Sequence, residues 1–293
     1  MSQSKQVLVT GAAGMLGSQV LLSAPDGVQT IGTDLVEAAG VQEVGVDLAD
    51  ERQVGELFER LGGISGVIHT AAFTAVDLAE EQEELALRVN GTACGVLSAV
   101  AKAAGIPQVL VGTDFVFDGE SGRAYHEEDE PNPVSAYGRT KLAGERLAME
   151  AYPEGTRIVR TQWLYGPRGK HFPGTMLGLA KERKQLKVVD DQTGSPTSTL
   201  ELAPALWDVL ERGVDPIYHA ACEGHCTWFG LACETFDAAG VQGVEIAPCS
   251  TEEFPRPARR PVHSVLDCGR LTSLRGKALA PWQDALRTFL GSE

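Results

Sequence analysis

The segment Gln6-Val7-Leu8-Val9-Thr10-Gly11-Ala12-Ala13-Gly14-Met15-Leu16-Gly17 decides the fold. Its first five residues are an apolar, β-branched run that predicts a buried strand, and a helix is expected to follow, to about Ser23. Glycines three residues apart at a strand-to-helix turn let the backbone approach a pyrophosphate, which binds at the N-terminus of the helix. The spacing of Gly11, Gly14 and Gly17 therefore predicts a dinucleotide-binding turn.

The alternation of strand and helix continues to about residue 161. Strands are expected at 28–33, in a segment ending at 46–48, and at 66–72, 109–111 and 157–161, with helices at 51–61 and 83–104. Such alternation predicts an α/β fold with a doubly wound parallel sheet (Rossmann), which binds ligands outside the carboxyl ends of its strands. The residues expected at those ends are the glycine turn, Asp34, Asp47, Ala71, Ala72 and Thr113.

The chain is expected to divide into two parts. Residues 1–161 form the dinucleotide-binding domain, and residues 162–293 form mainly a smaller C-terminal substrate-binding lobe. The second part contains helical segments at 172–183 and 200–212, but turns rich in proline and glycine interrupt its pattern. Some of its elements are expected to be interleaved into the first domain.

Asp34 follows the second strand, at the distance from the glycine turn where an acidic residue binds the adenosine ribose hydroxyls of a dinucleotide. Before Lys102, the only basic residues after it are Arg52, Arg60 and Arg88. A ribose 2′-phosphate therefore has no evident counter-ion nearby, which favours NADH over NADPH. The simpler alternative is that Asp34 is a turn residue at the end of its strand.

Tyr137 and Lys141 are four residues apart at the start of a predicted amphipathic helix, so they point the same way. A positive charge favours the phenolate of a nearby tyrosine, whose usual pKa is ~10. We therefore expect Lys141 to lower the pKa of Tyr137 toward neutrality, where an acid–base catalyst works best. Thr113, at the end of a strand, can donate a hydrogen bond to the same reacting oxygen. Alone, the Tyr-x-x-x-Lys spacing fits an ordinary surface helix; the glycine turn is what favours a catalytic pair.

Composition restricts the class of partner. The chain has 25 Lys and Arg against 40 Asp and Glu, a formal charge of −15, which argues against binding to nucleic acid or to an anionic membrane. Basic residues at 168–171, 181–187 and 256–260 still allow an anionic small molecule. The N-terminus does not resemble a signal peptide, and no apolar run approaches the ~20 residues that span a bilayer. The six scattered cysteines are interpreted as reduced thiols of a cytoplasmic protein.

One segment raises the question of a metal site. His219, Cys222, His225 and Cys226 lie close together in the sequence. Their spacing matches no common zinc pattern, and cysteine is often simply a buried residue. We expect no metal here.

Further motifs follow in order along nearly the whole chain. They include His69-Thr70-Ala71-Ala72-Phe73-Thr74-Ala75-Val76-Asp77, Thr113-Asp114-Phe115-Val116-Phe117-Asp118-Gly119, Arg160-Thr161-x-Trp163-x-Tyr165-Gly166, Asp191-Gln192-x-Gly194-x-Pro196-Thr197 and Arg260-Pro261-x-x-Ser264-x-Leu266-Asp267. With the glycine turn and the Tyr137/Lys141 pair, these motifs make the chain resemble the extended short-chain dehydrogenase/reductase superfamily. Within that superfamily it resembles the dTDP-4-dehydrorhamnose reductase family.

The resemblance implies NAD(P)H-dependent reduction of the C4 ketone of dTDP-4-dehydro-6-deoxy-L-mannose to dTDP-L-rhamnose. It implies that Thr113, Tyr137 and Lys141 are catalytic, with Tyr137 as the proton donor. It assigns substrate contacts to Thr113, Asp114, Tyr137 and Trp163. It assigns the cofactor, NADH or NADPH, to Gly11, Gly14, Met15, Leu16, Gly17, Asp34, Asp47, Leu48, Ala71, Ala72, Phe73, Thr74, Tyr137 and Lys141.

The chain departs from this pattern at two places. Some relatives bind a divalent metal between subunits through glutamates, but the matching positions here are Gln19 and Leu200, so a homodimer would not be bridged by metal. Sugar dehydratases of the superfamily carry an Asp-Glu pair after the catalytic threonine, whereas Phe115 follows Asp114 here, which disfavours dehydration. Two alternatives stay open: a 4-ketoreductase for another nucleotide-deoxysugar, and a non-catalytic regulatory subunit similar to the methionine adenosyltransferase partner.

Overall fold

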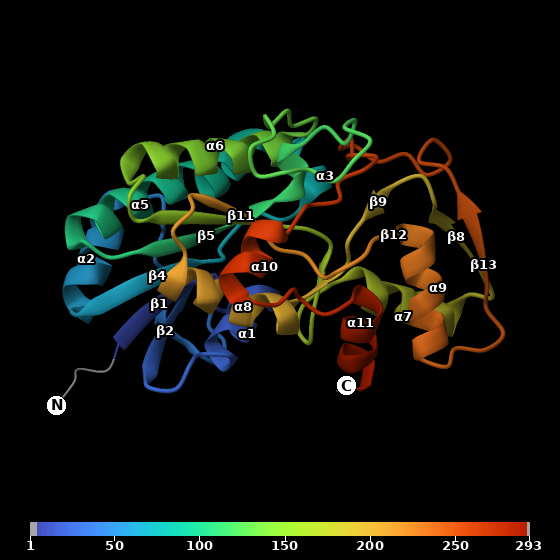
Figure 1. Ribbon diagram of the computed structural model, residues 1–293, viewed down its shortest axis with the longest axis horizontal. Helices are drawn as coiled ribbons and strands as arrows, with labels where there is room; N and C mark the ends of the chain where they lie inside the picture. The colour runs from blue at the N-terminus through green and yellow to red at the C-terminus, as the bar shows by residue number, and fades with distance from the viewer. Residues whose placement is uncertain (1–4, 292–293) are drawn as a thin grey trace.

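The computed structural model describes residues 5–291, and within that range its main sheet has seven strands, all parallel (Figure 1). Their order is β11-β6-β5-β4-β1-β2-β3, which is doubly wound about β1 and β4. The predicted fold class is confirmed. The strands are β1 (Lys5–Thr10), β2 (Val28–Asp34), β3 (Val41–Val44), β4 (Ile64–His69), β5 (Gln108–Thr113), β6 (Thr156–Thr161) and β11 (Ile217–His219).

Helices cover both faces of this sheet (Figure 1). On one face lie α2 (Glu51–Leu61), α5 (Ala93–Ala104) and α6 (Ala136–Ala151), and on the other α1 (Met15–Leu22), α8 (Thr199–Arg212) and α10 (Gly269–Arg275). Neighbouring residues of β1 enter different cores, Leu8 on the α2/α5 side and Val9 on the α1/α8 side, because side chains alternate along a strand. Because β1 is buried on both faces of the sheet, its sequence contains a continuous apolar run, Val7-Leu8-Val9.

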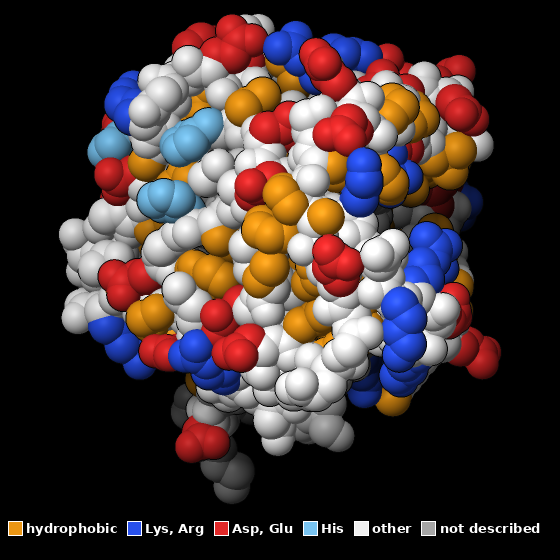
Figure 2. Space-filling model, turned by 90° about the vertical axis from the view of Figure 1, so that its right-hand side faces the viewer, with side chains coloured by type: hydrophobic (Ala, Val, Ile, Leu, Met, Phe, Trp, Pro, Cys, Tyr) orange, Lys and Arg blue, Asp and Glu red, His pale blue; other side chains and the backbone are white. Residues whose placement is uncertain are grey.

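The smaller lobe is built on the parallel pair β8 (Gln185–Val189) and β13 (Glu245–Cys249). Around it lie α7 (Phe172–Glu182), α9 (Trp228–Ala238) and α11 (Trp282–Gly291), with the short strands β7 (Leu164–Tyr165), β9 (Thr193–Gly194), β10 (Thr197–Ser198) and β12 (Cys226–Thr227). Figure 2 views the molecule from this end and shows acidic and basic side chains interspersed with small hydrophobic groups. Although β11 and α8 lie beyond residue 162 in the sequence, they belong to the main sheet and its helical layer.

The helix expected over 83–104 is interrupted. It consists of α4 (Glu83–Leu87), a π-helical turn η1 (Arg88–Thr92) and α5. Asn90, buried in the π turn, accepts from the Phe73 amide at 2.8 Å and donates to the Phe73 carbonyl at 3.2 Å and to Thr140 Oγ1 at 3.1 Å. These contacts connect the segment after β4 to α6 and explain a turn that helix propensity alone does not predict.

The third strand also ends earlier than expected, at Val44 rather than at 46–48. Gly45 follows it with φ +79°, a left-handed conformation that ends the extended strand. Asp47 therefore lies in the turn before α2, where its Oδ1 accepts from the Ala49 amide at 2.9 Å.

All six cysteines are free thiols, and Cys94, Cys222 and Cys249 are buried. Among the helices within residues 5–291, none combines the length and the apolar character that crossing a membrane requires.

Candidate active site

A cleft of about 580 Å³ lies at the carboxyl edge of the main sheet. Its walls come from the glycine turn, the ends of β2, β4 and β5, the first turns of α6, and the segment after β6. It brings together every predicted site residue except one: Gly11, Gly14, Met15, Leu16, Gly17, Asp34, Asp47, Leu48, Ala71, Ala72, Thr74, Thr113, Asp114, Tyr137, Lys141 and Trp163 line it. The exception is Phe73, which, like Tyr137, packs against the buried cluster of Ala79, Ala86 and Ala136.

In the glycine turn, the backbone at Gly11 lies close to the segment after β4 and to the backbone at Gly17. Gly11 has φ +67°, and a Cβ on it would lie 2.5 Å from the amide nitrogen of Ala71 at the end of β4. A Cβ on Gly17 would lie 2.1 Å from the carbonyl oxygen of Gly11. No larger residue fits either position without moving the backbone, so the turn leaves the N-terminus of α1 open to the cleft.

Asp34 and Asp47 border the same part of the cleft. Asp34 Oδ2 accepts from the Ala13 amide at 3.0 Å, so this carboxylate holds the glycine turn against the end of β2. Asp47 pairs with Arg88, whose Nη2 lies 2.5 Å from Oδ2, and this hydrogen bond holds the pKa of Asp47 below its usual value. Arg88 is one of the three basic residues between Asp34 and Lys102, and its guanidinium is paired with Asp47.

Tyr137 and Lys141 enter the cleft from the first turns of α6. Ser135 caps this helix, its Oγ accepting from the Gly138 amide at 3.2 Å. Lys141 Nζ donates to the Val111 carbonyl of β5 at 2.7 Å, and the Thr113 hydroxyl, at the end of the same strand, lies near enough to the Tyr137 phenol to lower its pKa. Strand β5 therefore holds Lys141 through Val111 and brings Thr113 to the same cleft as Tyr137.

The expected effect of Lys141 on Tyr137 is wrong. Burial raises the pKa of Tyr137 to about 12, and the Asp114 carboxylate raises it further, while the Thr113 hydrogen bond opposes the rise. Burial also lowers the pKa of Lys141, whose ammonium is directed at the Val111 carbonyl. Sequence spacing placed the two groups on one face, but desolvation of the phenol outweighs the charge that this spacing brings near.

Asp114 is the most strongly perturbed carboxyl of the cleft. It is 2% exposed, and burial raises its pKa to about 7, an effect that the nearby Ser264 and Thr113 hydroxyls oppose. Its Oδ1 lies 3.2 Å from Thr113 Oγ1. Within residues 5–291, its Oδ2 has no hydrogen-bond partner.

Trp163 forms part of the opposite wall. Its backbone has φ +47°, a left-handed conformation that is costly for a residue with a large side chain. Its indole stacks on Trp228 of α9, with ring centroids 3.5 Å apart and an angle of 9° between the planes. Gly194 allows this placement, since a Cβ there would lie 2.6 Å from the Trp163 ring.

The sequence prediction missed several lining residues, chiefly Thr161, Gln162 and Lys170. Gln162 Oε1 accepts from the Ser195 amide at 2.9 Å; among the described atoms, its Nε2 and Thr161 Oγ1 are buried without a hydrogen-bond partner. Thr161 and Gln162 could have been predicted as lining residues, because they lie beside Trp163 at the carboxyl end of β6. Lys170 belongs to the basic cluster at 168–171, whereas Arg260, of another such cluster, pairs bidentately with Asp77.

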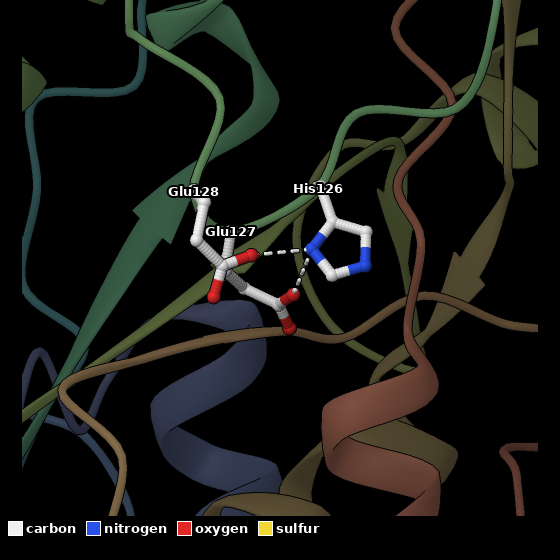
Figure 3. A group of neighbouring side chains, drawn as sticks. All are labelled: His126, Glu127 and Glu128. Carbon is white, nitrogen blue, oxygen red and sulfur yellow. Dashed lines mark hydrogen bonds and ion pairs between the residues drawn. The ribbon is translucent and has the colours of Figure 1, made fainter.

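Figure 3 shows a second group of titratable side chains, away from the cleft lining. His126 Nδ1 lies 2.5 Å from Glu128 Oε2 and 3.6 Å from Glu127 Oε2. Arg270 also contacts Glu128, and Glu127 Oε1 accepts from the His219 amide at 3.1 Å. The hydrogen bond with Glu128 raises the pKa of His126, and burial raises the pKa of Glu127. Contacts of Glu128 with His126 and Arg270 hold this cluster together.

Comparisons with known proteins agree with this geometry. The chain is 38% identical over 287 residues to a dTDP-4-dehydrorhamnose reductase from Streptomyces griseus, covering 95% of this chain and 91% of the relative. A dTDP-4-keto-6-deoxy-D-glucose reductase from Streptomyces niveus is 36% identical, with 88% and 87% covered. The crystal structure of a dTDP-4-dehydrorhamnose reductase from Bacillus anthracis in complex with NADP superposes with a TM-score of 0.91 at 31% identity, covering 99% of this chain and 100% of that one. The family model described as the RmlD substrate binding domain matches residues 5–293, and the chain belongs to this family.

Proposed function

We propose that this chain is an NAD(P)H-dependent oxidoreductase that reduces the C4 ketone of dTDP-4-dehydro-6-deoxy-L-mannose to dTDP-L-rhamnose. The observation that carries the proposal is that Thr113, Tyr137 and Lys141 line the same cleft as the glycine turn. The relatives' names supply the substrate, and the cleft supplies groups suited to polarise and protonate a carbonyl oxygen.

The cleft fits a nicotinamide dinucleotide at its glycine turn. The close backbone approach at Gly11 and Gly17 presents the N-terminus of α1 to the cleft, where a pyrophosphate binds, and Ala71 and Ala72 are small where the sheet edge meets the cleft. Asp34 is placed to accept from ribose hydroxyls, which favours NADH. When bound, the reduced nicotinamide supplies the hydride for C4.

The chain's own residues handle the proton. Tyr137, whose pKa burial raises to about 12, stays protonated across the physiological range and donates its proton to the alkoxide that develops at C4. Thr113 orients the carbonyl oxygen beside the phenol. Lys141, held by Val111, brings a positive charge to the cleft where negative charge develops.

The test is NADH or NADPH oxidation by the purified protein with synthesised dTDP-4-dehydro-6-deoxy-L-mannose, followed by NMR of the product sugar. Turnover that yields the L-rhamnose configuration supports the proposal. Tyr137→Phe should lower kcat by about 10²–10⁴-fold, the usual contribution of a positioned proton donor. Tyr152→Phe, the same change at a residue that does not line the cleft, is the control. A Tyr137→Phe enzyme as fast as the parent would remove Tyr137 from the donor role.

A second candidate is reduction of a different dTDP-4-keto-6-deoxyhexose, favoured by the likeness to the Streptomyces niveus protein. The same three side chains would act, so only substrate preference and product stereochemistry separate the two. Cofactor choice is tested in the same assay: a KM for NADPH well below that for NADH would contradict the role given to Asp34. A protein that binds nucleotide but turns over neither sugar would point to the non-catalytic alternative.

A further inference from the structure

The lining of the cleft offers little free positive charge to the two ligands proposed above. NADH and a dTDP-sugar each carry an anionic diphosphate, whereas the lining contains the carboxyl groups of Asp34, Asp47 and Asp114. The cations among the described lining residues are Lys141 and Lys170. Lys141 is buried, and its ammonium already donates to a backbone carbonyl of β5 at 2.7 Å. Lys170 is exposed, and within residues 5–291 it forms no ion pair or hydrogen bond, so its charge is free to meet a ligand.

Lys170 lies on the segment of residues 166–171, which joins β7 to α7. The first residue of this segment, Gly166, packs against the start of α8, because a Cβ there would lie 2.0 Å from Thr199 Oγ1. The last residue, His171, caps α7 by accepting a backbone amide at 3.1 Å. Both ends of the segment are therefore fixed, so little backbone ordering is needed before Lys170 can bind a ligand.

The middle of the same segment lies beside the N-terminus of α1. Gly169 has φ +81°, and a Cβ on it would lie 3.6 Å from Met15 Cε and 3.7 Å from Met15 Cβ. Met15 is the first residue of α1, and it lines the cleft together with Lys170. Anions bind at helix N-termini because the backbone amides and the helix dipole give a partial positive charge there. Lys170 adds a full positive charge to this part of the cleft.

We propose that Lys170 is a binding residue of the cleft that recognises a diphosphate. Both proposed ligands carry this group, and the closeness of Gly169 to Met15 favours the diphosphate of the dinucleotide. The formal charge of the whole chain is −15, so its overall field repels an anion, and a local cation at the cleft offsets that repulsion. This inference rests on the proposed function for the identity of the two ligands.

The simpler alternative is that Lys170 is a solvated surface charge. Arg168, two residues earlier on the same segment, allows the two readings to be separated. It is exposed and, among the described residues, forms no ion pair or hydrogen bond, but it does not line the cleft. A long-range effect of positive charge would be similar at both positions, whereas a direct contact with a diphosphate belongs to Lys170 alone.

Calorimetric titrations of the purified chain with NADH and, separately, with dTDP test the proposal without turnover. Lys170→Met should weaken the binding of a diphosphate ligand at least about tenfold, the effect of losing a hydrogen bond to a charged group. Arg168→Met removes the same charge from the same segment and should change the affinity less than about threefold, as for an exposed, screened charge. Lys170→Arg keeps the charge and should retain most of the affinity.

The two ligands distinguish the two sources of the diphosphate. A loss of affinity for NADH assigns Lys170 to the cofactor, and a loss for dTDP assigns it to the nucleotide sugar; either supports the proposal. Equal affinities of Lys170→Met and Arg168→Met for both ligands overturn it. Raising the salt concentration provides a second measurement, because it should weaken binding by the parent more than binding by Lys170→Met. An equal salt dependence counts against a direct contact.

Failure of the proposed function would look different from failure of this inference. A chain that binds NADH through Lys170 but reduces no keto sugar contradicts the proposed function and leaves the role of Lys170 intact. A chain that reduces the sugar, while Lys170→Met binds both ligands as tightly as the parent, keeps the function and contradicts the role of Lys170. A parent chain that binds neither nucleotide contradicts both.

Discussion

Arg160 and Glu145 form an ion pair beneath the helix that carries Tyr137 and Lys141. Arg160 Nη2 lies 2.7 Å from Glu145 Oε2, and the two side chains are 3% and 7% exposed. Arg160 Nε also donates to the same carboxylate at 3.1 Å. Because Arg160 belongs to β6 and Glu145 to α6, the pair attaches the helix of the candidate active site to the sheet.

Glu145→Ala is expected to lower the free energy of unfolding by about 3–5 kcal/mol, because it leaves a buried guanidinium without a counter-charge. Chemical denaturation measures this loss. The double variant Arg160→Met/Glu145→Leu should recover most of it, since neither charge remains. As a control, Glu56→Ala breaks the exposed Arg52–Glu56 pair and should cost less than about 1 kcal/mol. Equal losses for Glu145→Ala and Glu56→Ala would contradict the prediction.

Gly17→Ala is expected to weaken NADH binding at least about tenfold, an effect of roughly 1.4 kcal/mol. The added Cβ would meet the Gly11 carbonyl oxygen at 2.1 Å and Thr70 Oγ1 at 2.7 Å, so the turn must open. Titration of nucleotide fluorescence measures the affinity. Gly55→Ala in α2 is the matched control: no described atom lies within 4 Å of its Cβ position, and the change should leave binding intact. Unchanged affinity in Gly17→Ala would show that the turn tolerates a side chain.

The free energy of unfolding should carry a pH dependence from Asp114. Its folded pKa is raised from 3.8 to about 7, so between about pH 4 and pH 7 the native state binds more protons at this group than the unfolded state does. Stability from this group is therefore lost as pH rises through that window. At ~1.4 kcal/mol per pKa unit, Asp114→Asn should gain up to about 4 kcal/mol on the parent between pH 4 and pH 8. Parallel stability–pH curves for the two proteins would rule this out.

Trp228→Leu is expected to raise the KM for the nucleotide sugar with less effect on kcat. Trp228 is the stacking partner that holds the Trp163 ring, and Trp163 occupies a left-handed backbone conformation that its surroundings must maintain. Loss of an aromatic pair worth about 0.5–1.5 kcal/mol corresponds to a rise in KM of roughly two- to tenfold. Steady-state kinetics measure it, with the exposed Phe254→Ala as control. A fall in kcat without a rise in KM would contradict a role of Trp163 in binding the nucleotide sugar.

Much of the candidate site was predictable because it depends on local pattern. The apolar strand before Gly11 and the glycine spacing predicted β1, its turn and α1. The i, i+4 spacing predicted that Tyr137 and Lys141 share a face, and both line the cleft. Trp163 was predicted because it belongs to a recognisable motif. Its neighbour Gln162 was missed, because the side-chain amide of Gln162 binds Ser195, which is distant in sequence.

Other features depended on contacts that no local pattern contains. The π turn at Arg88–Thr92 is explained by hydrogen bonds of Asn90 to Phe73 and Thr140, which the chain brings together only on folding. The same is true of the pKa of Tyr137: the sequence showed a lysine one turn away, but not the depth of burial of the phenol.

The sequence by itself determined the doubly wound sheet, the glycine turn at its edge and the identity of the side chains that meet there. These follow from residue periodicity and from the rule that parallel strands end at a common edge. Only the tertiary structure decided what surrounds those side chains: that Lys141 is held by Val111, and that burial raises the pKa values of Tyr137 and Asp114. The physical reason is that desolvation and hydrogen bonding depend on every group packed around an atom, and most of those groups are distant along the chain.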